Sequence, residues 1–135
     1  MSKKIDYFCL SSKEEAAMKV LWATNEELSA SSIADKIPNR SWPASSIQSI
    51  VRSLEKKGAI EVSSISKIGK SYGRLFRPTL SSNEYAAMQF DRYYKVSGHD
   101  SYSFLSSLLG NKTKNIKDEV IGTLRALLDE YEKED

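Results

Sequence analysis

A polar helix face without an acid is predicted in residues 41–58, which read SWPASSIQSIVRSLEKKG. At about 100° per residue, the apolar side chains of this segment fall on one side of a helix and would pack into a core. The other side carries hydroxyls, an amide and two cations, whereas an ordinary solvated face mixes Glu with Lys. Such side chains can pair with phosphates and exchange hydrogen bonds with base edges, where an acid would be repelled. They are Ser45, Ser46, Gln48, Ser49, Arg52 and Lys56.

Positive charge is concentrated around this face. Between Lys36 and Arg77 there are nine lysines and arginines and only two acids, although the formal net charge of the 135 residues is only +2 at pH 7. From residue 81 onward, acids outnumber bases. A solvated basic surface is the commoner explanation of a single basic cluster, but this cluster coincides with the polar face. The asymmetry is typical of one half that binds a polyanion and another half with a different role.

The segments before residue 41 predict two helices that would support the polar one. The first begins at a capping box within Ser11–Glu15 and runs to about Ala23. The second is about two turns long, is capped by Ser29 or Ser31, and ends before Pro38.

The polar helix and the segment after it complete a known arrangement. Pro43 suits the first turn of the helix, and Gly58 suits its left-handed cap. From Ile60 the apolar period changes to two and continues to Pro78, which predicts a β-hairpin. Helix, helix, polar helix and hairpin follow one another in a winged helix-turn-helix, in which the second helix of the pair enters the major groove of DNA. We expect further DNA contacts from Lys67 and Lys70 at the hairpin tip and from Arg74 near its base.

The C-terminal half predicts three more helices, over about residues 82–96, 102–109 and 115–132. Their apolar stripes would be marginal in isolation, so either the N-terminal half or another chain must cover them. We favour a homodimer. The fold class is therefore mostly α (α+β), with a winged-helix domain over residues 1–80 and a helical dimerisation domain over residues 81–135. The predicted dimer interface contains Tyr85, Met88, Phe104, Leu105, Leu108, Val120, Ile121, Leu124, Leu127 and Leu128.

Motifs for catalysis fail in this sequence. Gly69-Lys70-Ser71 resembles the end of a phosphate-binding loop, but the full pattern needs a glycine at Ser64 and a strand-to-helix context. Nucleophile-elbow, zinc-protease and calcium-loop patterns do not occur, and acid pairs such as Glu14 and Glu15 are interpreted as first-turn charges. We predict no enzymatic activity, no catalytic residues, no metal and no cofactor.

The cysteine and the start of the chain bear on the compartment. Cys9 is the only cysteine, so an internal disulfide is excluded; we interpret it as a small apolar filler, with a redox sensor as the alternative. Neither a membrane-length apolar run nor a secretory signal is found. We expect a cytoplasmic protein that does not contact a membrane.

Four stretches carry a resemblance to a known family. They are LSSKEEAAMKVLW (10–22), SASSIADKIP (29–38), SWPASSIQSIVRSLEKKGAI (41–60) and LRALLDE (124–130). Together they resemble the penicillinase-repressor family, which includes the methicillin-resistance and copper-responsive repressors. The third of them is similar to the family's Trp-Ser-x-x-Thr-Val-x-Thr recognition helix with its Arg-Leu-x-x-Lys-Gly ending. The resemblance implies a homodimer whose winged helices bind an inverted-repeat operator, with Ser46 and Ser49 in the places of the two threonines. Phe76-Arg77-Pro78 matches the aromatic-x-Pro that closes the wing.

The sequence also departs from that family. Pro43 replaces the usual capping Ser, and the hairpin is several residues longer than is typical. Ser107-Leu108 stands near the place of the Asn-Phe cleavage site of the antibiotic-responsive members, and the tail DEYEKED lacks the paired Cys-x-Cys motifs of the copper-responsive ones. The inducing signal therefore stays open.

Two functions compete for this pattern. The first is a sequence-specific DNA-binding repressor, and the second is a winged-helix module that binds proteins and not DNA. Interaction modules tend to fill the recognition face with exposed apolar or acidic residues, which this sequence does not. We therefore favour the repressor, with double-stranded DNA and a second copy of the chain as partners.

Overall fold

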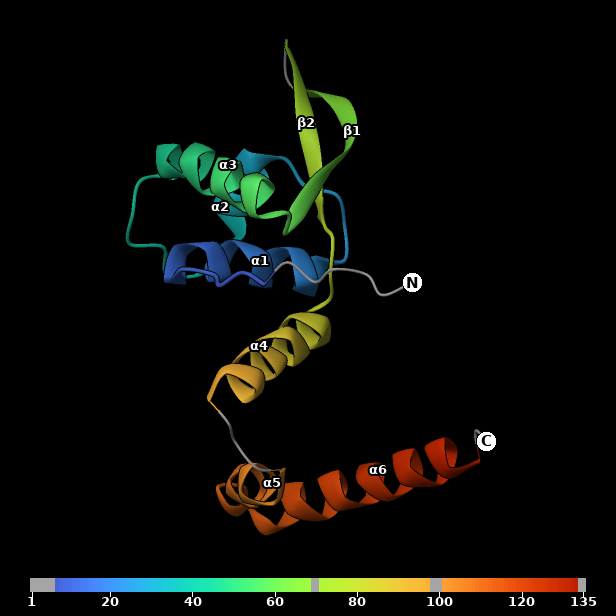
Figure 1. Cartoon of the computed structure of the whole chain (residues 1–135). Helices are drawn as coiled ribbons and strands as arrows, with labels where there is room; N and C mark the ends of the chain where they lie inside the picture. Colours follow the sequence, from blue (N-terminus) through green and yellow to red (C-terminus); the bar gives the residue numbers. More distant parts are fainter. Residues whose placement is uncertain (1–6, 69–70, 98–100, 134–135) are drawn as a thin grey trace. The chain divides into compact units, whose positions relative to one another are not determined.

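The computed structural model describes residues 7–68, 71–97 and 101–133 (Figure 1). The chain forms two compact units, Met1–Arg92 and Tyr93–Asp135. The mostly helical class with one β-hairpin is confirmed, while the domain boundary after residue 80 stays a prediction. In chain order the elements are α1 (Ser12–Thr24), α2 (Ala30–Lys36), the 3-10 turn η1 (Ala44–Ser46), α3 (Ile47–Lys57), β1 (Ile60–Ile68), β2 (Ser71–Pro78), α4 (Ser82–Ser97), α5 (Ser101–Gly110) and α6 (Lys114–Glu132).

Side-chain caps fix the starts of α1 and α2. The Ser11 hydroxyl accepts a hydrogen bond from the Glu14 backbone N–H at 3.2 Å, and the Glu14 carboxylate accepts one from the Ser11 N–H at 2.8 Å. This reciprocal pair is the capping box that the sequence predicts. At α2, the structure selects Ser29 over Ser31, because the Ser29 hydroxyl accepts from the Ser32 N–H at 3.2 Å.

The start of α3 differs from the prediction, and its end does not. Pro43 has an extended backbone (φ −63°, ψ 146°) and precedes the 3-10 turn, so its placement in the first helical turn is wrong by one position. Its carbonyl accepts a hydrogen bond from the Ser46 N–H at 3.0 Å, which begins the turn instead. Gly58 ends α3 at φ 83°, a left-handed conformation that glycine adopts without a steric penalty.

Strands β1 and β2 form an antiparallel hairpin, the wing, whose base is joined to the helices. The register pairs Ile60 with Pro78, and a bulge interrupts it between Val62 and Ser64. Leu28, in the connection between α1 and α2, exchanges two backbone hydrogen bonds with Phe76 of β2, at 2.8 and 3.1 Å. This bridge anchors the wing to the segment that enters α2.

An apolar core joins α1, α2, α3 and the base of the wing. Each helix contributes side chains at helical spacing, as the sequence predicts, and Phe76 contributes from the wing. Half-buried Trp22 and Trp42 pack against the core. Its least exposed members, at 2% or less, are Ala17, Met18, Leu21, Ile33, Ala34, Ile47, Val51, Leu54, Ala59 and Phe76.

The first part of α4 packs within this first unit. Trp22 Nε1 donates a hydrogen bond to the Leu80 carbonyl at 2.9 Å, just before α4 begins. The Tyr85 ring lies near the rings of Phe8 and Trp22, with centroids 5.8 and 6.0 Å away. The Tyr85 hydroxyl accepts from the Leu10 N–H at 2.9 Å. The start of α4 and the segment before α1 therefore hold each other.

The second unit leaves apolar side chains open in the single chain. No described residue of α6 is buried, although its apolar side chains follow one stripe. Leu128 is 60% exposed and Tyr131 is 67% exposed. None of the described helices is both long and apolar enough to cross a membrane.

Candidate nucleic-acid interface

The core fixes which face of α3 is open to solvent. Ile47, Ile50, Val51 and Leu54 are all buried, so the opposite side of the helix must point outward. That side is exposed except at the half-buried Ser46 and Ser53. We call the exposed residues of this side, including Ser45 of η1, the polar face of α3. It consists of Ser45, Gln48, Ser49, Arg52 and Lys56.

Hydrogen bonding leaves this face largely available. The Ser49 hydroxyl donates to the Ser46 carbonyl at 3.0 Å, so its oxygen remains able to accept a hydrogen bond from a ligand. Arg52 and Lys56 form no ion pair with the described residues. These two cations can therefore meet an external anion without first breaking an internal pair.

One acid adjoins the polar face, and the wing neutralises it. Glu55 of α3 is half-buried, and its Oε1 lies 3.2 Å from Nη1 of Arg74 in β2. The Arg74 guanidinium also lies 5.1 Å from the centre of the Phe76 ring. Arg74 was predicted to contact DNA, and the structure gives it two internal partners that any such contact would have to share.

Several cations of the basic segment have internal partners as well. Lys57 pairs with Glu14 at 2.5 Å, and Arg77 pairs with Glu61 at 2.7 Å. Arg40 donates hydrogen bonds to backbone carbonyls and lies over the Trp42 ring. The sequence count therefore overstates the charge that is open to a partner. Among the described residues, the cations of this segment without an acidic partner are Lys36, Arg40, Arg52, Lys56 and Lys67.

Besides Arg74, the wing carries the predicted cation Lys67, and it also exposes two apolar side chains that the prediction missed. Lys67 is exposed near the end of β1, whereas Lys70 lies outside the described residues. Tyr72 pairs with Lys67 across the strands and is 76% exposed, and Ile65 is 69% exposed. A two-stranded hairpin has no second layer to cover such side chains. Alternation alone places Tyr72 on the same face of β2 as the buried Phe76, so it did not predict this exposure.

Glu14 of α1 is a buried charge that contacts the C-terminal half of α3. Its side chain is 5% exposed and receives hydrogen bonds from Lys57, Ser11 and Ser53. Burial raises the pKa of this carboxyl, but hydrogen bonds from Lys57, the Ser11 backbone and the Ser53 hydroxyl outweigh burial and lower the pKa to about 2. The sequence predicted the cap but not the ion pair, whose partner lies far along the chain.

The interpretation of Cys9 as an apolar filler is wrong, because the residue is exposed. Its segment lies on the surface of the first unit, where its backbone carbonyl accepts a hydrogen bond from Lys57 Nζ at 2.7 Å. Among the described residues, no group of His, Cys, Asp and Glu side chains could hold a metal ion.

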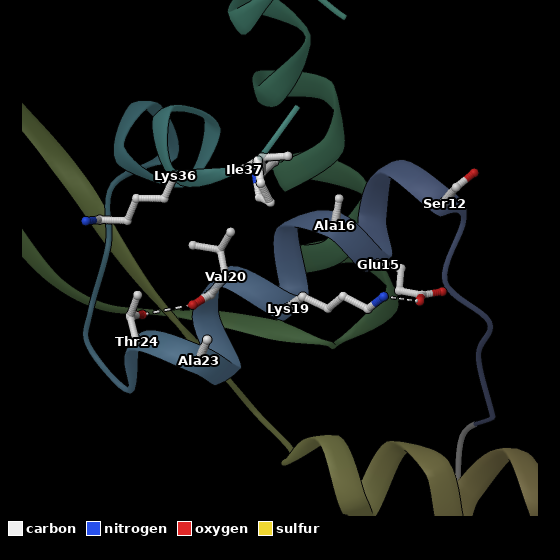
Figure 2. A pocket seen from close by; sticks show the side chains of 10 residues that line it. Ser12, Glu15, Ala16, Lys19, Val20, Ala23, Thr24, Lys36 and Ile37 are labelled. Carbon is white, nitrogen blue, oxygen red and sulfur yellow. Dashed lines mark hydrogen bonds and ion pairs between the residues drawn. The ribbon is translucent and has the colours of Figure 1, made fainter. Parts of the chain in front are cut away.

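A separate groove of about 760 Å³ lies along α1. It is lined by Ala16, Val20 and Lys19 of α1, by Lys36 of α2 and by Ile37 after it (Figure 2). Lys19 pairs with Glu15 at 3.0 Å there. Val20 and Ile37 also belong to the apolar core, and the groove contains none of the predicted DNA-binding residues.

The predicted dimer residues fall into two groups. Tyr85 and Met88 are half-buried in α4 within the first unit, and Tyr85 already contacts Phe8 and Trp22. The remainder lie in α5 and α6. Of these, Phe104 and Val120 are half-buried, and the exposed ones are Leu105, Leu108, Ile121, Leu124, Leu127 and Leu128.

The chain is similar to one protein family and to several solved structures. Residues 10–130 match the family model described as penicillinase repressor. No match was found among curated proteins. Among solved structures, the zinc-responsive MarR family member ZitR of Lactococcus lactis is 15% identical, with 95% of this chain and 80% of that chain covered and a TM-score of 0.42. A cysteine-to-serine mutant of ZitR in complex with DNA is also 15% identical, with 97% and 82% covered and a TM-score of 0.40.

Proposed function

The chain belongs to the penicillinase repressor family of DNA-binding transcriptional regulators, and from this premise we propose that it is a homodimeric repressor of an inverted-repeat operator. It acts in the cytoplasm, and its inducer is a separate question. The observation that carries the proposal is the polar face of α3. Gln48 and Arg52 are both exposed on it, and the adjoining acid is occupied by Arg74.

In this proposal, α3 is the recognition helix and enters the major groove. Ser45, Gln48 and Ser49 lie near its N-terminal end, where a helix-turn-helix meets base edges. A glutamine can bind adenine with two hydrogen bonds, and serine can donate to or accept from several bases. Arg52 and Lys56, farther along the same face, reach phosphates or guanine. Lys67 on the wing contacts the neighbouring backbone.

The second unit supplies the dimer in this proposal. Its exposed leucines recur along α5 and α6, and exposed apolar side chains in such number are typical of an interaction site. A two-fold axis would place the same surface of each copy against the other. It would also match the symmetry of an inverted repeat, which presents two equivalent half-sites.

Selection of bound genomic fragments tests the proposal. Purified protein is incubated with sheared DNA of the host, and the retained fragments are sequenced at moderate salt. We expect enrichment of one inverted repeat, with half-sites separated by about one helical turn or a multiple of it. Retention of fragments without a shared motif would exclude a sequence-specific regulator. A winged-helix module that binds proteins would retain no DNA at all.

A further inference from the structure

Two adjacent lysines at the end of α3 have different surroundings. Lys56 is exposed and has no ion pair with the described residues. The Lys57 side chain is only 32% exposed, and its Nζ donates to Glu14 Oε1 at 2.5 Å and to the Cys9 carbonyl at 2.7 Å. The ammonium group of Lys56 is therefore open to an external anion, whereas that of Lys57 is bound within the protein.

Glu14 connects Lys57 to the start of α1. Its Oε2 accepts a hydrogen bond at 2.7 Å from Ser53, which is also in α3, and its Oε1 accepts one at 2.8 Å from the Ser11 N–H. A carboxylate with 5% of its side chain exposed is costly unless such donors surround it. The hydrogen bonds from Ser53 and Lys57 of α3 to Glu14 must therefore be kept, and they fix the C-terminal half of α3 against α1.

The Cys9 carbonyl connects Lys57 to α4. Residues 7–10, the N-terminal strap, lie outside the helices and strands and pass between contacts from two elements. Three of these contacts involve the backbone of the strap. They are Gln89 Nε2 donating to the Phe8 carbonyl at 2.6 Å, the Leu10 N–H donating to the Tyr85 hydroxyl at 2.9 Å, and Lys57 Nζ donating to the Cys9 carbonyl at 2.7 Å.

We propose that Lys57 and Glu14 are positioning residues for operator recognition, which hold the polar face of α3 at a fixed orientation relative to α4. The proposal rests on the proposed function and adds to it residues that do not themselves touch DNA. Helix α4 leads along the chain into the second unit. The proposed homodimer must bind two half-sites at the same time. The orientation of α3 relative to α4 therefore decides whether the polar faces of both copies reach their bases.

The adjacent lysines provide a matched test. The probes are the inverted-repeat duplex recovered by selection and a scrambled duplex of the same length and composition. Lys57→Met keeps most of the aliphatic stem but removes the donors. We expect about a tenfold loss of affinity for the selected duplex, comparable to one mismatched base pair, with unchanged affinity for the scrambled one. The dependence of binding on salt should also be unchanged, because no phosphate contact is lost.

Lys56→Met is the control for charge. It should weaken binding to both duplexes and reduce the slope of log affinity against log salt by about one. Lys57→Arg should recover the selectivity, because arginine can donate to both acceptors. Glu14→Gln keeps an acceptor for the Ser11 N–H and should lower selectivity in the same direction as Lys57→Met. It replaces that variant if Lys57→Met fails to fold by circular dichroism.

The outcomes separate the two proposals. If Lys57→Met weakens both duplexes equally and lowers the salt slope as Lys56→Met does, Lys57 contacts phosphate and the positioning role is wrong. If selectivity survives in both Lys57→Met and Glu14→Gln, the positioning role is again wrong while the repressor stands. If the unaltered protein does not prefer the selected duplex, the repressor proposal itself fails, and the positioning role fails with it.

Discussion

Arg74 in the wing and Glu55 in α3 form an ion pair in which Nη1 and Oε1 are 3.2 Å apart. The pair joins two elements that would lie against DNA together, and it neutralises the acid that adjoins the polar face of α3. Its contribution to folding stability is small because Arg74 is 54% exposed. Its larger consequence is electrostatic, because the pair leaves no unpaired carboxylate of Glu55 beside the surface that would face a polyanion.

Replacement of Arg74 should therefore weaken operator binding through Glu55. In Arg74→Gln the carboxylate of Glu55 is left without its partner beside the phosphates, and we expect a loss of roughly 1 kcal/mol in a gel-shift titration. The double variant Arg74→Gln/Glu55→Gln removes the carboxylate and should regain most of this loss. No recovery in the double variant would mean that Arg74 contacts DNA directly.

Arg52→Ala removes the guanidinium of α3 from the proposed interface. Arg52 has no ion pair with the described residues, so its loss should not disturb the fold. Binding to the selected duplex should weaken by roughly 1–3 kcal/mol if Arg52 reads a base, and by less if it meets only phosphate. Titrations with single-base variants of the half-site distinguish the two cases, and unchanged affinity would remove Arg52 from the interface.

Operator affinity should fall steeply with salt. Arg52, Lys56 and Lys67 are open to solvent, and each phosphate that a cation neutralises releases condensed counterions. Titrations between about 50 and 200 mM salt should give a straight line of log affinity against log salt with a clearly negative slope. A flat line would be incompatible with these cations as phosphate contacts.

Acid should remove the stabilisation that Glu14 provides. The pKa of Glu14 is lowered from its ordinary 4.5 to about 2, so the folded state binds this proton less readily than the unfolded state. The stabilisation is complete above pH 4.5 and is lost as the pH falls toward 2. Glu14→Gln should lower the free energy of unfolding at pH 7, on the order of 2 kcal/mol. Urea titrations should show that this difference shrinks between pH 5 and pH 3, whereas a constant difference would contradict the ionic role.

Leu124→Asp should separate the subunits of the proposed dimer. Leu124 is 36% exposed in the single chain and lies on the apolar stripe of α6, so a carboxylate there would be buried at a two-fold interface at high cost. Sedimentation velocity should show monomers, and circular dichroism should show that the helices of the first unit persist. A variant that remains dimeric would place the interface elsewhere.

The local pattern of apolar and polar residues predicted most of the fold, because helices and hairpins depend on periodicity over a few residues. The boundary at Gly58, the cap at Ser11 and the solvent-facing side of α3 all follow from residues within one or two turns of each other. The exposed polar face was likewise predictable, because burial of Ile50 and Leu54 determines which side is open. Whether these residues contact DNA remains a prediction.

Pairs that are distant in sequence could not be predicted in the same way. Nothing near Glu14 indicates that Lys57 will bind it, and nothing near Leu28 indicates a bridge to Phe76. The open charge was overestimated for this reason, since counting Lys57 and Arg77 as free requires no knowledge of their partners. Cys9 was misjudged because its surroundings come from α4 and α3 rather than from its own segment.

The connection between α3 and the wing has almost no slack. After Gly58, only Ala59 precedes β1, and its N–H and carbonyl are both bound, to Leu54 of α3 and to Thr79 after β2. The base of the hairpin and the end of the helix are consequently coupled through this joint. A displacement at the base of the wing would be transmitted to the C-terminal end of α3 and, through Lys57 and Ser53, to Glu14 of α1.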